Sequence, residues 1–274
     1  MAWPWLSSSS SSITTPPPWS PPSTNTSPQE KHQVFISFRS EDTRKTFTSH
    51  LNAALKRLDI RTYIDNNLER GDEISDTLIR AIEEAKISVI VFSKHYAVSK
   101  WCLDELLKIV ECGTKGQIIV PVFYDIDPSD VRNQRGTYGE AFNKHEWTFQ
   151  HNMEVISKWR DGLVCAANLS GWDCSVNRTE LEIVEEIAMD VLQKLNRVDV
   201  SDLDHQIKKY EQLAELQHQY FETKPSLENW RNHQATVERI TQLKMERNLR
   251  LLRLTPEMLS HMGNSTTNTY NYFS

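Results

Sequence analysis

One acidic and one aromatic side chain at helical spacing are the residues of this sequence best suited to chemistry. Trp101 and Glu105 lie four residues apart, so a helix holds the indole and the carboxylate on one side, a turn apart. The apolar positions of the same stretch form a separate stripe, which consists of Leu103, Leu106, Leu107 and Val110. Periodicity alone favours a solvated Glu105 that pairs with Lys108, and a functional carboxylate is the alternative.

The elements around this helix predict the fold that positions it. A β-branched run at 87–92 precedes the helix, as in a strand buried on both faces. Strands and helices alternate along the chain, which predicts an α/β fold with a flavodoxin-like five-stranded parallel sheet, order 2-1-3-4-5, flanked by helices. The expected strands are 33–38, 60–64, 87–92, 117–124 and 169–172. Pro121 in the fourth strand predicts an edge position or a local bulge.

This topology gives Glu105 and Trp101 a second interpretation. Ligands of such sheets bind beyond the carboxyl ends of the strands, at the switch point between strands 1 and 3. The loops expected there are 38–44 and 93–101. The helix that carries Glu105 therefore begins beside the expected crevice, which favours a functional carboxylate more than periodicity does.

Composition argues against several function classes. The chain has 274 residues and a net charge of −6, so it offers no basic field for nucleic acid as the main partner. No apolar run is long enough for a membrane span, and no glycine-rich phosphate-binding motif occurs. The four cysteines show no metal-binding spacing, so we expect no metal site and free thiols in a reducing compartment. They are Cys102, Cys112, Cys165 and Cys174.

The ends of the chain differ from its middle. Residues 1–32 are rich in serine and proline, which predicts a disordered tail. Residues 33–196 hold the α/β pattern, and 197–274 predict a helical extension of unknown role. In that extension, 201–204 form a weak capping box for one helix, and a second helix is expected from Leu227 to Leu254.

Three stretches together are similar to one family. Residues 34–51 (VFISFRSEDTRKTFTSHL), 99–106 (SKWCLDEL) and 120–132 (VPVFYDIDPSDVR) resemble a plant-type TIR (Toll/interleukin-1 receptor) domain. Phe142, Trp159 and the segment 168–172 (NLSGW) continue the resemblance. It covers roughly 33–196, and its motifs follow the family's order.

The resemblance implies an NAD⁺ nucleosidase that is activated by self-association and acts in plant defence. NAD⁺ is then the substrate, cleaved at the nicotinamide–ribose bond, and no cofactor is bound. The family's catalytic glutamate corresponds to Glu105, and its Ser-His contact pair between subunits to Ser49 and His50. Its nucleotide site corresponds to Arg39, Ser40, Glu41, Asp42, Thr43, Arg44, Arg70, Gly71 and Trp101.

One departure from the family pattern leaves a second function open. Ser40 stands where the family usually has glycine, and a side chain there narrows the approach of a ligand to the backbone. The alternative is a non-catalytic TIR adaptor that acts only through TIR–TIR contacts. Because no P-loop follows Arg197, the chain resembles the truncated, TIR-only class. The expected partners are other TIR domains, including full-length TIR-type receptors, in the cytoplasm with the nucleus as a second compartment.

Overall fold

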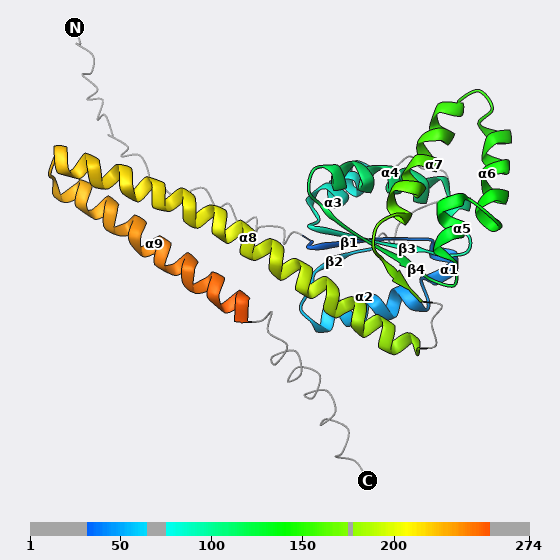
Figure 1. Ribbon diagram of the computed structural model, residues 1–274, viewed down its shortest axis with the longest axis horizontal. Helices are drawn as coiled ribbons and strands as arrows, with labels where there is room; N and C mark the ends of the chain where they lie inside the picture. Colours follow the sequence, from blue (N-terminus) through cyan, green and yellow to red (C-terminus); the bar gives the residue numbers. More distant parts are fainter. Residues whose placement is uncertain (1–31, 65–74, 175–177, 253–274) are drawn as a thin grey trace, which may run out of the picture. The chain divides into compact units, whose positions relative to one another are not determined.

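A five-stranded parallel sheet organises the fold (Figure 1). The computed structural model describes residues 32–64, 75–174 and 178–252. The strand order is β2-β1-β3-β4-β5 and every neighbouring pair is parallel, as predicted. The strands are β1 (Val34–Phe38), β2 (Thr62–Tyr63), β3 (Ile87–Phe92), β4 (Ile118–Phe123) and β5 (Trp172–Asp173).

The central strands β1 and β3 are buried along their whole length, as expected of strands that helices cover on both faces. They pair in register from Val34 opposite Ile87 to Phe38 opposite Val91. Each contains one buried serine among apolar residues, Ser37 in β1 and Ser88 in β3. The carboxyl ends of the two strands therefore lie side by side, so the loops that follow them lie next to each other at the same end of the strands.

Helices pack on both faces of the sheet. One core cluster joins one face to α3, α4, α6 and α7, and a second joins the other face to α2 and the first part of α8 (Figure 1). The helices are α1 (Ser40–Thr43), α2 (Phe47–Arg57), α3 (Asp76–Glu84), α4 (Lys100–Thr114), α5 (Pro128–Asn133), α6 (Thr137–Thr148), α7 (Met153–Ala167), α8 (Glu180–Thr223) and α9 (Leu227–Leu252). A short 3₁₀ helix, η1 (Tyr96–Val98), precedes α4.

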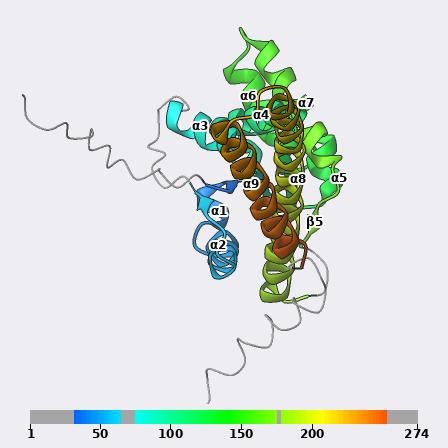
Figure 2. The same cartoon turned by 90° about the vertical axis from the view of Figure 1, so that its left-hand side faces the viewer.

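The C-terminal helices differ from the expectation at one point. We expected the α/β pattern to end at residue 196 and a helix of the extension to begin at the capping box 201–204, but α8 is continuous through both positions. Side chains from elsewhere hold this stretch in the helix: Asp199 accepts hydrogen bonds from Lys86 and Arg250. The capping pattern at Ser201 is therefore overridden by tertiary contacts. α9 begins at Leu227 as expected and packs along α8 (Figure 2). None of the helices described is long and apolar enough to cross a membrane.

Pro121 does not mark an edge strand. β4 lies between β3 and β5, so the predicted edge position is wrong. The neighbouring β5 has only two residues and pairs at Val122 and Phe123, which leaves Pro121 just before that ladder, where no partner strand needs its missing N–H. Gly171 approaches it there so closely that a Cβ at 171 would lie 2.5 Å from the Pro121 carbonyl oxygen.

Candidate functional site

Glu105 is buried, although periodicity favoured a solvated side chain. The residue is 4% exposed, and its Oε2 accepts a 2.8 Å hydrogen bond from the Ser37 hydroxyl of β1. The expected pairing with Lys108 is wrong, because that ammonium group contacts Glu83 at 2.6 Å and Glu111 at 3.2 Å. Glu105 therefore faces the end of the central strand rather than the solvent.

The buried face of α4 is wider than the predicted stripe. Leu103 and Leu106 are buried as expected, whereas Leu107 and Val110 are only partly buried. The helix packs against α7 and α3 as well as against the sheet, so more than one side of it is covered. Its buried residues are Cys102, Leu103, Glu105, Leu106, Ile109 and Cys112.

A buried hydrogen-bond network holds Glu105. Ser37 Oγ lies 2.9 Å from the Tyr96 hydroxyl, which donates to the Cys102 carbonyl oxygen at 2.9 Å. The Cys102 thiol in turn lies 3.7 Å from the Phe38 carbonyl oxygen, to which it donates. Burial, together with the nearby Cys102 and Glu105, raises the pKa of Tyr96 well above its usual value, so this hydroxyl stays protonated. The network fixes the first turns of α4 against the carboxyl end of β1.

Sequence reasoning missed Ser37 and Tyr96. A signal for Ser37 was present, because it is the one hydroxyl in the otherwise apolar strand VFISF and stands next to its carboxyl end. A buried polar side chain needs a partner, and here that partner is a carboxylate 68 positions away in the chain. Tyr96 carried no comparable signal, since its loop is not periodic.

A second carboxylate joins the loops after β1 and β3. Asp42 Oδ2 accepts hydrogen bonds from the Ser93 hydroxyl at 2.6 Å and from the His95 backbone N–H at 2.9 Å. Arg39 pairs with Glu41 and lies 3.7 Å from Asp42. Burial acts to raise the pKa of Asp42, but the hydrogen bonds from Ser93 and His95 outweigh it and hold that pKa below its usual value. These hydrogen bonds from Ser93 and His95 to Asp42, called the Asp42 clasp below, keep the two loops together at the predicted switch point.

The remaining predicted residues of the β1 loop lie in the short helix α1 or just after it. Arg44 donates two hydrogen bonds to Ser40 Oγ, at 3.1 and 2.7 Å, and its guanidinium lies 5.1 Å from the Phe38 ring centroid. Thr43 is buried and bonded to the Thr48 hydroxyl at 2.8 Å. Both arginines of this loop are therefore already engaged by neighbouring side chains.

Trp101 lies in the first turn of α4 and is partly buried. The Lys100 ammonium is 6.0 Å from its ring centroid. The structure thus brings Glu105, Trp101 and residues 39–44 to the same end of the sheet. Arg70 and Gly71, the other predicted nucleotide-site residues, lie outside the described residues.

The predicted contact pair lies on α2, apart from this cluster. His50 Nδ1 is 2.6 Å from Glu180 Oε1 at the start of α8, and Glu180 Oε2 accepts a 3.1 Å hydrogen bond from the Tyr124 hydroxyl. Ser49 is exposed and donates to the Thr46 carbonyl oxygen at 2.7 Å. The surface that His50 presents therefore includes the N-terminus of α8.

Comparisons with known proteins find a matching family, similar plant proteins and a similar solved structure. Residues 31–210 match the TIR domain family. The chain belongs to the TIR family. The TMV resistance protein N of Nicotiana glutinosa is 42% identical over 202 residues, which are 71% of this chain and 18% of that protein. The disease resistance protein RPV1 of Vitis rotundifolia is 48% identical over 172 residues, 62% of this chain and 12% of that protein.

A solved TIR structure supports the same assignment. The TIR domains of the activated Roq1 resistosome, which directly recognises the pathogen effector XopQ, align with a TM-score of 0.55 and 46% identity. The alignment covers 58% of this chain and 99% of that one. This TIR chain spans less than a fifth of the length of the two curated relatives.

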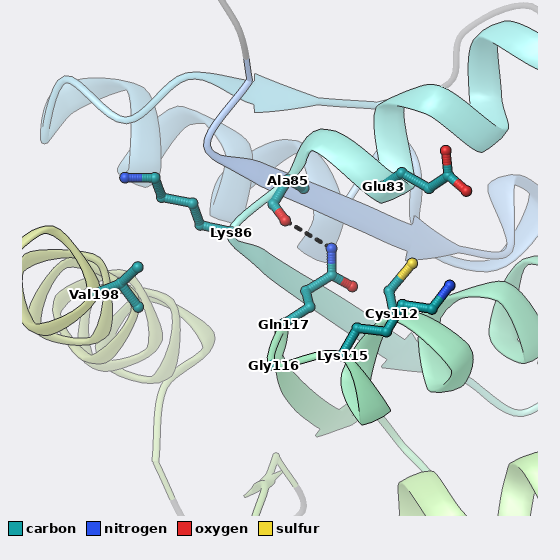
Figure 3. Close-up of a pocket in the computed structure, with 8 residues that line it drawn as sticks. All are labelled: Glu83, Ala85, Lys86, Cys112, Lys115, Gly116, Gln117 and Val198. Carbon is teal, nitrogen blue, oxygen red and sulfur yellow. Dashed lines mark hydrogen bonds between the residues drawn. The ribbon is translucent and has the colours of Figure 1, made fainter. Parts of the chain in front are cut away.

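The TIR domain also has a hollow of about 410 Å³ at the amino ends of the strands, before β3 and β4 (Figure 3). Gln117, one of its lining residues, donates to the carbonyl oxygens of Ile82 at 2.6 Å and Ala85 at 2.7 Å. Its lining residues are Glu83, Ala85, Lys86, Cys112, Lys115, Gly116, Gln117 and Val198. This hollow lies at the amino ends of the strands, so its lining residues are not part of the cluster around Glu105. Among the described residues, no group of three or more His, Cys, Asp and Glu is arranged to hold a metal ion.

The clasp around Asp42 predicts a pH-dependent loss of stability. Asp42→Asn removes the charge that Ser93 and His95 stabilise, and we expect a loss of roughly 1–3 kcal/mol at pH 7. Because the pKa of Asp42 is lowered in the folded state, this contribution is complete above its ordinary value of 3.8 and is lost as the pH falls through the folded-state value. Urea unfolding of both proteins at neutral and acidic pH checks this, and a difference that does not shrink in acid contradicts it.

Proposed function

We propose that this TIR domain is an NAD⁺ nucleosidase in which Glu105 is the essential carboxylate. The observation that carries the proposal is the burial of Glu105 at the carboxyl end of β1, with Ser37 donating to one of its oxygens. A carboxylate is expensive to bury and is seldom retained without a role. Membership of the family supports the same reading of the residue.

The chemistry requires only one carboxylate. Nicotinamide leaves from a pyridinium that already carries a positive charge, so no acid has to protonate it. The transition state resembles an oxocarbenium ion, as in glycoside hydrolysis. A carboxylate beside the ribose stabilises the developing positive charge. Water or a hydroxyl of the substrate then attacks the anomeric carbon and loses a proton, which gives linear or cyclic ADP-ribose beside the released nicotinamide.

Neighbouring residues take supporting roles in this proposal. Trp101, one turn before Glu105, stacks on an aromatic ring of the substrate or shields the site from water. Arg39 and Arg44 supply cations for the diphosphate. Each first has to leave its present partners, Glu41 and Asp42 for Arg39 and Ser40 for Arg44. Nucleotide binding is therefore expected to rearrange the β1 loop.

Nicotinamide release from NAD⁺ by the purified, concentrated chain tests the proposal. Wild type is expected to release it, and a variant lacking the carboxylate of Glu105 is not. If wild type releases none even when oligomerisation is forced, the enzyme assignment is lost. Equal release by both proteins leaves an enzyme but removes Glu105 from its catalytic role.

A specific observation keeps the adaptor function as the second candidate. Ser40, where the family usually has glycine, accepts both hydrogen bonds from Arg44. That pairing holds Arg44, one of the residues proposed to bind the diphosphate, within the loop. Ser40→Gly removes these two hydrogen bonds from Arg44. A gain of nicotinamide release in this variant favours an enzyme held back by Ser40, and the absence of release in both proteins favours the adaptor.

We also propose that the TIR domain self-associates through the surface around His50. The variant His50→Ala is expected to lower self-association. It should leave the fold intact, because the exposed pair with Glu180 contributes only about 0–1 kcal/mol. Sedimentation velocity, with circular dichroism as the check on folding, measures this. His205→Ala, at an exposed histidine of α8, is the matched control, and an unchanged oligomer distribution in His50→Ala contradicts the assignment.

The setting we propose is defence signalling in the plant cytoplasm, and in the nucleus as well. All four cysteines are free thiols, which suits a reducing compartment. The relatives named as resistance proteins suggest that full-length TIR-type receptors are partners, in addition to copies of this chain.

A further inference from the structure

His95 is a half-exposed histidine whose ring is oriented by Asp42. Its Nδ1 lies 3.3 Å from Asp42 Oδ1, and its backbone N–H donates to Oδ2 of the same carboxylate at 2.9 Å. The Asp42 side chain itself is largely buried. Because the backbone and the ring of His95 both contact one fixed carboxylate, the imidazole has a defined orientation on the loop after β3.

The charge of Asp42 decides which nitrogen of this ring carries the proton. Burial acts to raise the pKa of Asp42, but its hydrogen bonds hold that pKa below the usual value, so the group is ionised and can only accept. The proton of the neutral ring is therefore assigned to Nδ1, and Nε2 keeps its lone pair. In the part of the chain that the structure describes, no group is bonded to His95 Nε2.

The loop that carries His95 also contacts the network around Glu105. Tyr96, the next residue, lies 2.9 Å from Ser37 Oγ through its hydroxyl, and Ser37 donates to Glu105 at 2.8 Å. Two adjacent residues of one short loop therefore serve two different carboxylates. Tyr96 supports the buried one, and His95 pairs with the other at the surface.

The two carboxylates lie near each other. Burial raises the pKa of the Cys102 thiol most, and the negative charges of Glu105 and Asp42 raise it further. Charges have such an effect on a side chain only when they are close to it. Glu105 and the Asp42–His95 pair therefore belong to one site at the carboxyl ends of β1 and β3.

We propose that His95 Nε2 is the general base that takes the proton from the water attacking the anomeric carbon, so that this chain forms linear ADP-ribose. The inference rests on the proposed nucleosidase function. The bond from the anomeric carbon to the nicotinamide nitrogen breaks, and its electron pair stays with nicotinamide. The water oxygen bonds to that carbon, and one water proton passes to Nε2. Asp42 stabilises the imidazolium until it returns the proton to solvent.

Exposure of the ring favours water as the nucleophile. Half of the His95 side chain is accessible to solvent, so Nε2 meets bulk water rather than a hydroxyl held within the substrate. In the proposed function Arg39, 3.7 Å from Asp42, leaves this carboxylate for the diphosphate. His95 then becomes the main partner of Asp42, and their 3.3 Å contact shortens, as catalytic hydrogen bonds of ligand-free enzymes often do in the complex.

Two substitutions in the full chain separate the base from the Asp42 clasp. His95→Asn keeps a side-chain N–H that donates to Asp42 but has no basic nitrogen, and His95→Ala has neither. We expect both variants to form linear ADP-ribose about 10²-fold more slowly than wild type, which is the lower end of what a positioned base contributes. His205→Ala, at an exposed histidine of α8, should keep the wild-type rate.

Azide identifies the step that the two variants lack. The azide anion has no proton to lose, so its attack on the anomeric carbon needs no base. Adding azide is expected to return nicotinamide release in His95→Asn and His95→Ala to near the wild-type rate, with ADP-ribosyl azide as the product. The rate of His205→Ala should not change. Chromatography of the nucleotide products measures all of these rates.

Each other outcome overturns the inference. A wild-type rate in His95→Asn shows that a donor to Asp42 is sufficient, and a loss that azide does not restore shows damage to the site rather than a missing base. A cyclic product from wild type excludes water as the nucleophile. If wild type releases no nicotinamide, the proposed function fails and this inference with it, whereas an active wild type beside equally active His95 variants removes this inference alone.

Discussion

Replacing Glu105 with glutamine is expected to abolish nicotinamide release while the protein stays folded. Glutamine keeps the shape of the side chain, and its amide oxygen still accepts the hydrogen bond from Ser37 that the carboxylate accepts at 2.8 Å. The negative charge disappears, and the second carboxylate oxygen, an acceptor, becomes an amide NH₂ donor. Since that charge is proposed to stabilise the oxocarbenium-like transition state, we expect turnover to fall by about 10²–10³-fold or more.

The thermal stability of Glu105→Gln is expected to be equal to that of wild type or higher. A buried carboxylate pays a desolvation cost that a neutral amide largely avoids. Thermal unfolding of Glu105→Gln should therefore occur at or above the wild-type midpoint. The matched control is Glu111→Gln on the exposed side of the same helix, which should keep full activity. A variant Glu105→Gln that retains wild-type turnover contradicts the proposed role of the charge.

Removing the indole of Trp159 is expected to have the largest effect on stability. Trp159 is fully buried in α7, its ring lies 5.2 Å from His145 and 5.5 Å from Phe149 between centroids, and its Nε1–H donates to Asp104 at 2.8 Å. Trp159→Ala leaves a cavity at the junction of α7 and α4, and we expect a loss of about 3–5 kcal/mol.

The phenylalanine variant separates packing from the hydrogen bond. Trp159→Phe retains most of the ring but leaves Asp104 without the indole donor, and its loss should be about 1.5–3 kcal/mol. Urea unfolding of the two variants measures both losses. Equal losses in alanine and phenylalanine would show that the hydrogen bond to Asp104, rather than the packing of the ring, dominates.

The sheet was predictable because its signals are local. The β-branched run of β3 and the apolar strand that contains Ser37 each identify a buried strand without knowledge of the remainder of the chain. Short connections between alternating strands and helices then leave few topologies for a parallel sheet. The predicted order agrees with the structure for this reason.

The environment of Glu105 was not predictable from its helix. Periodicity identifies one covered face, whereas α4 is covered by the sheet, α3 and α7. The group that settles the orientation of Glu105 is Ser37, 68 positions away, and no local pattern links the two. Tyr96 extends the same network from a loop. The neighbourhood was anticipated by the topology argument, which placed both loops at one switch point, and by the resemblance to the TIR family.

The continuous α8 shows a similar limit at the other end of the chain. The Ser201–Asp204 segment has a capping pattern, but Lys86 and Arg250 bind Asp199 just before it. These partners come from the start of β3 and the end of α9. A capping signal contributes about 1 kcal/mol, so contacts of this kind are sufficient to override it.

The close approach of Gly171 to Pro121 has a consequence for how this sequence can vary. Any side chain at 171 would place its first carbon 2.5 Å from the carbonyl oxygen of Pro121, directly before the two residues at which β5 pairs with β4. Every replacement, even by alanine, therefore has to push the last strand away from the sheet. In a library that samples all residues at 171 and is selected for folded protein, we expect to recover only glycine. The same selection at the exposed neighbour Ser170 is expected to accept nearly any substitution.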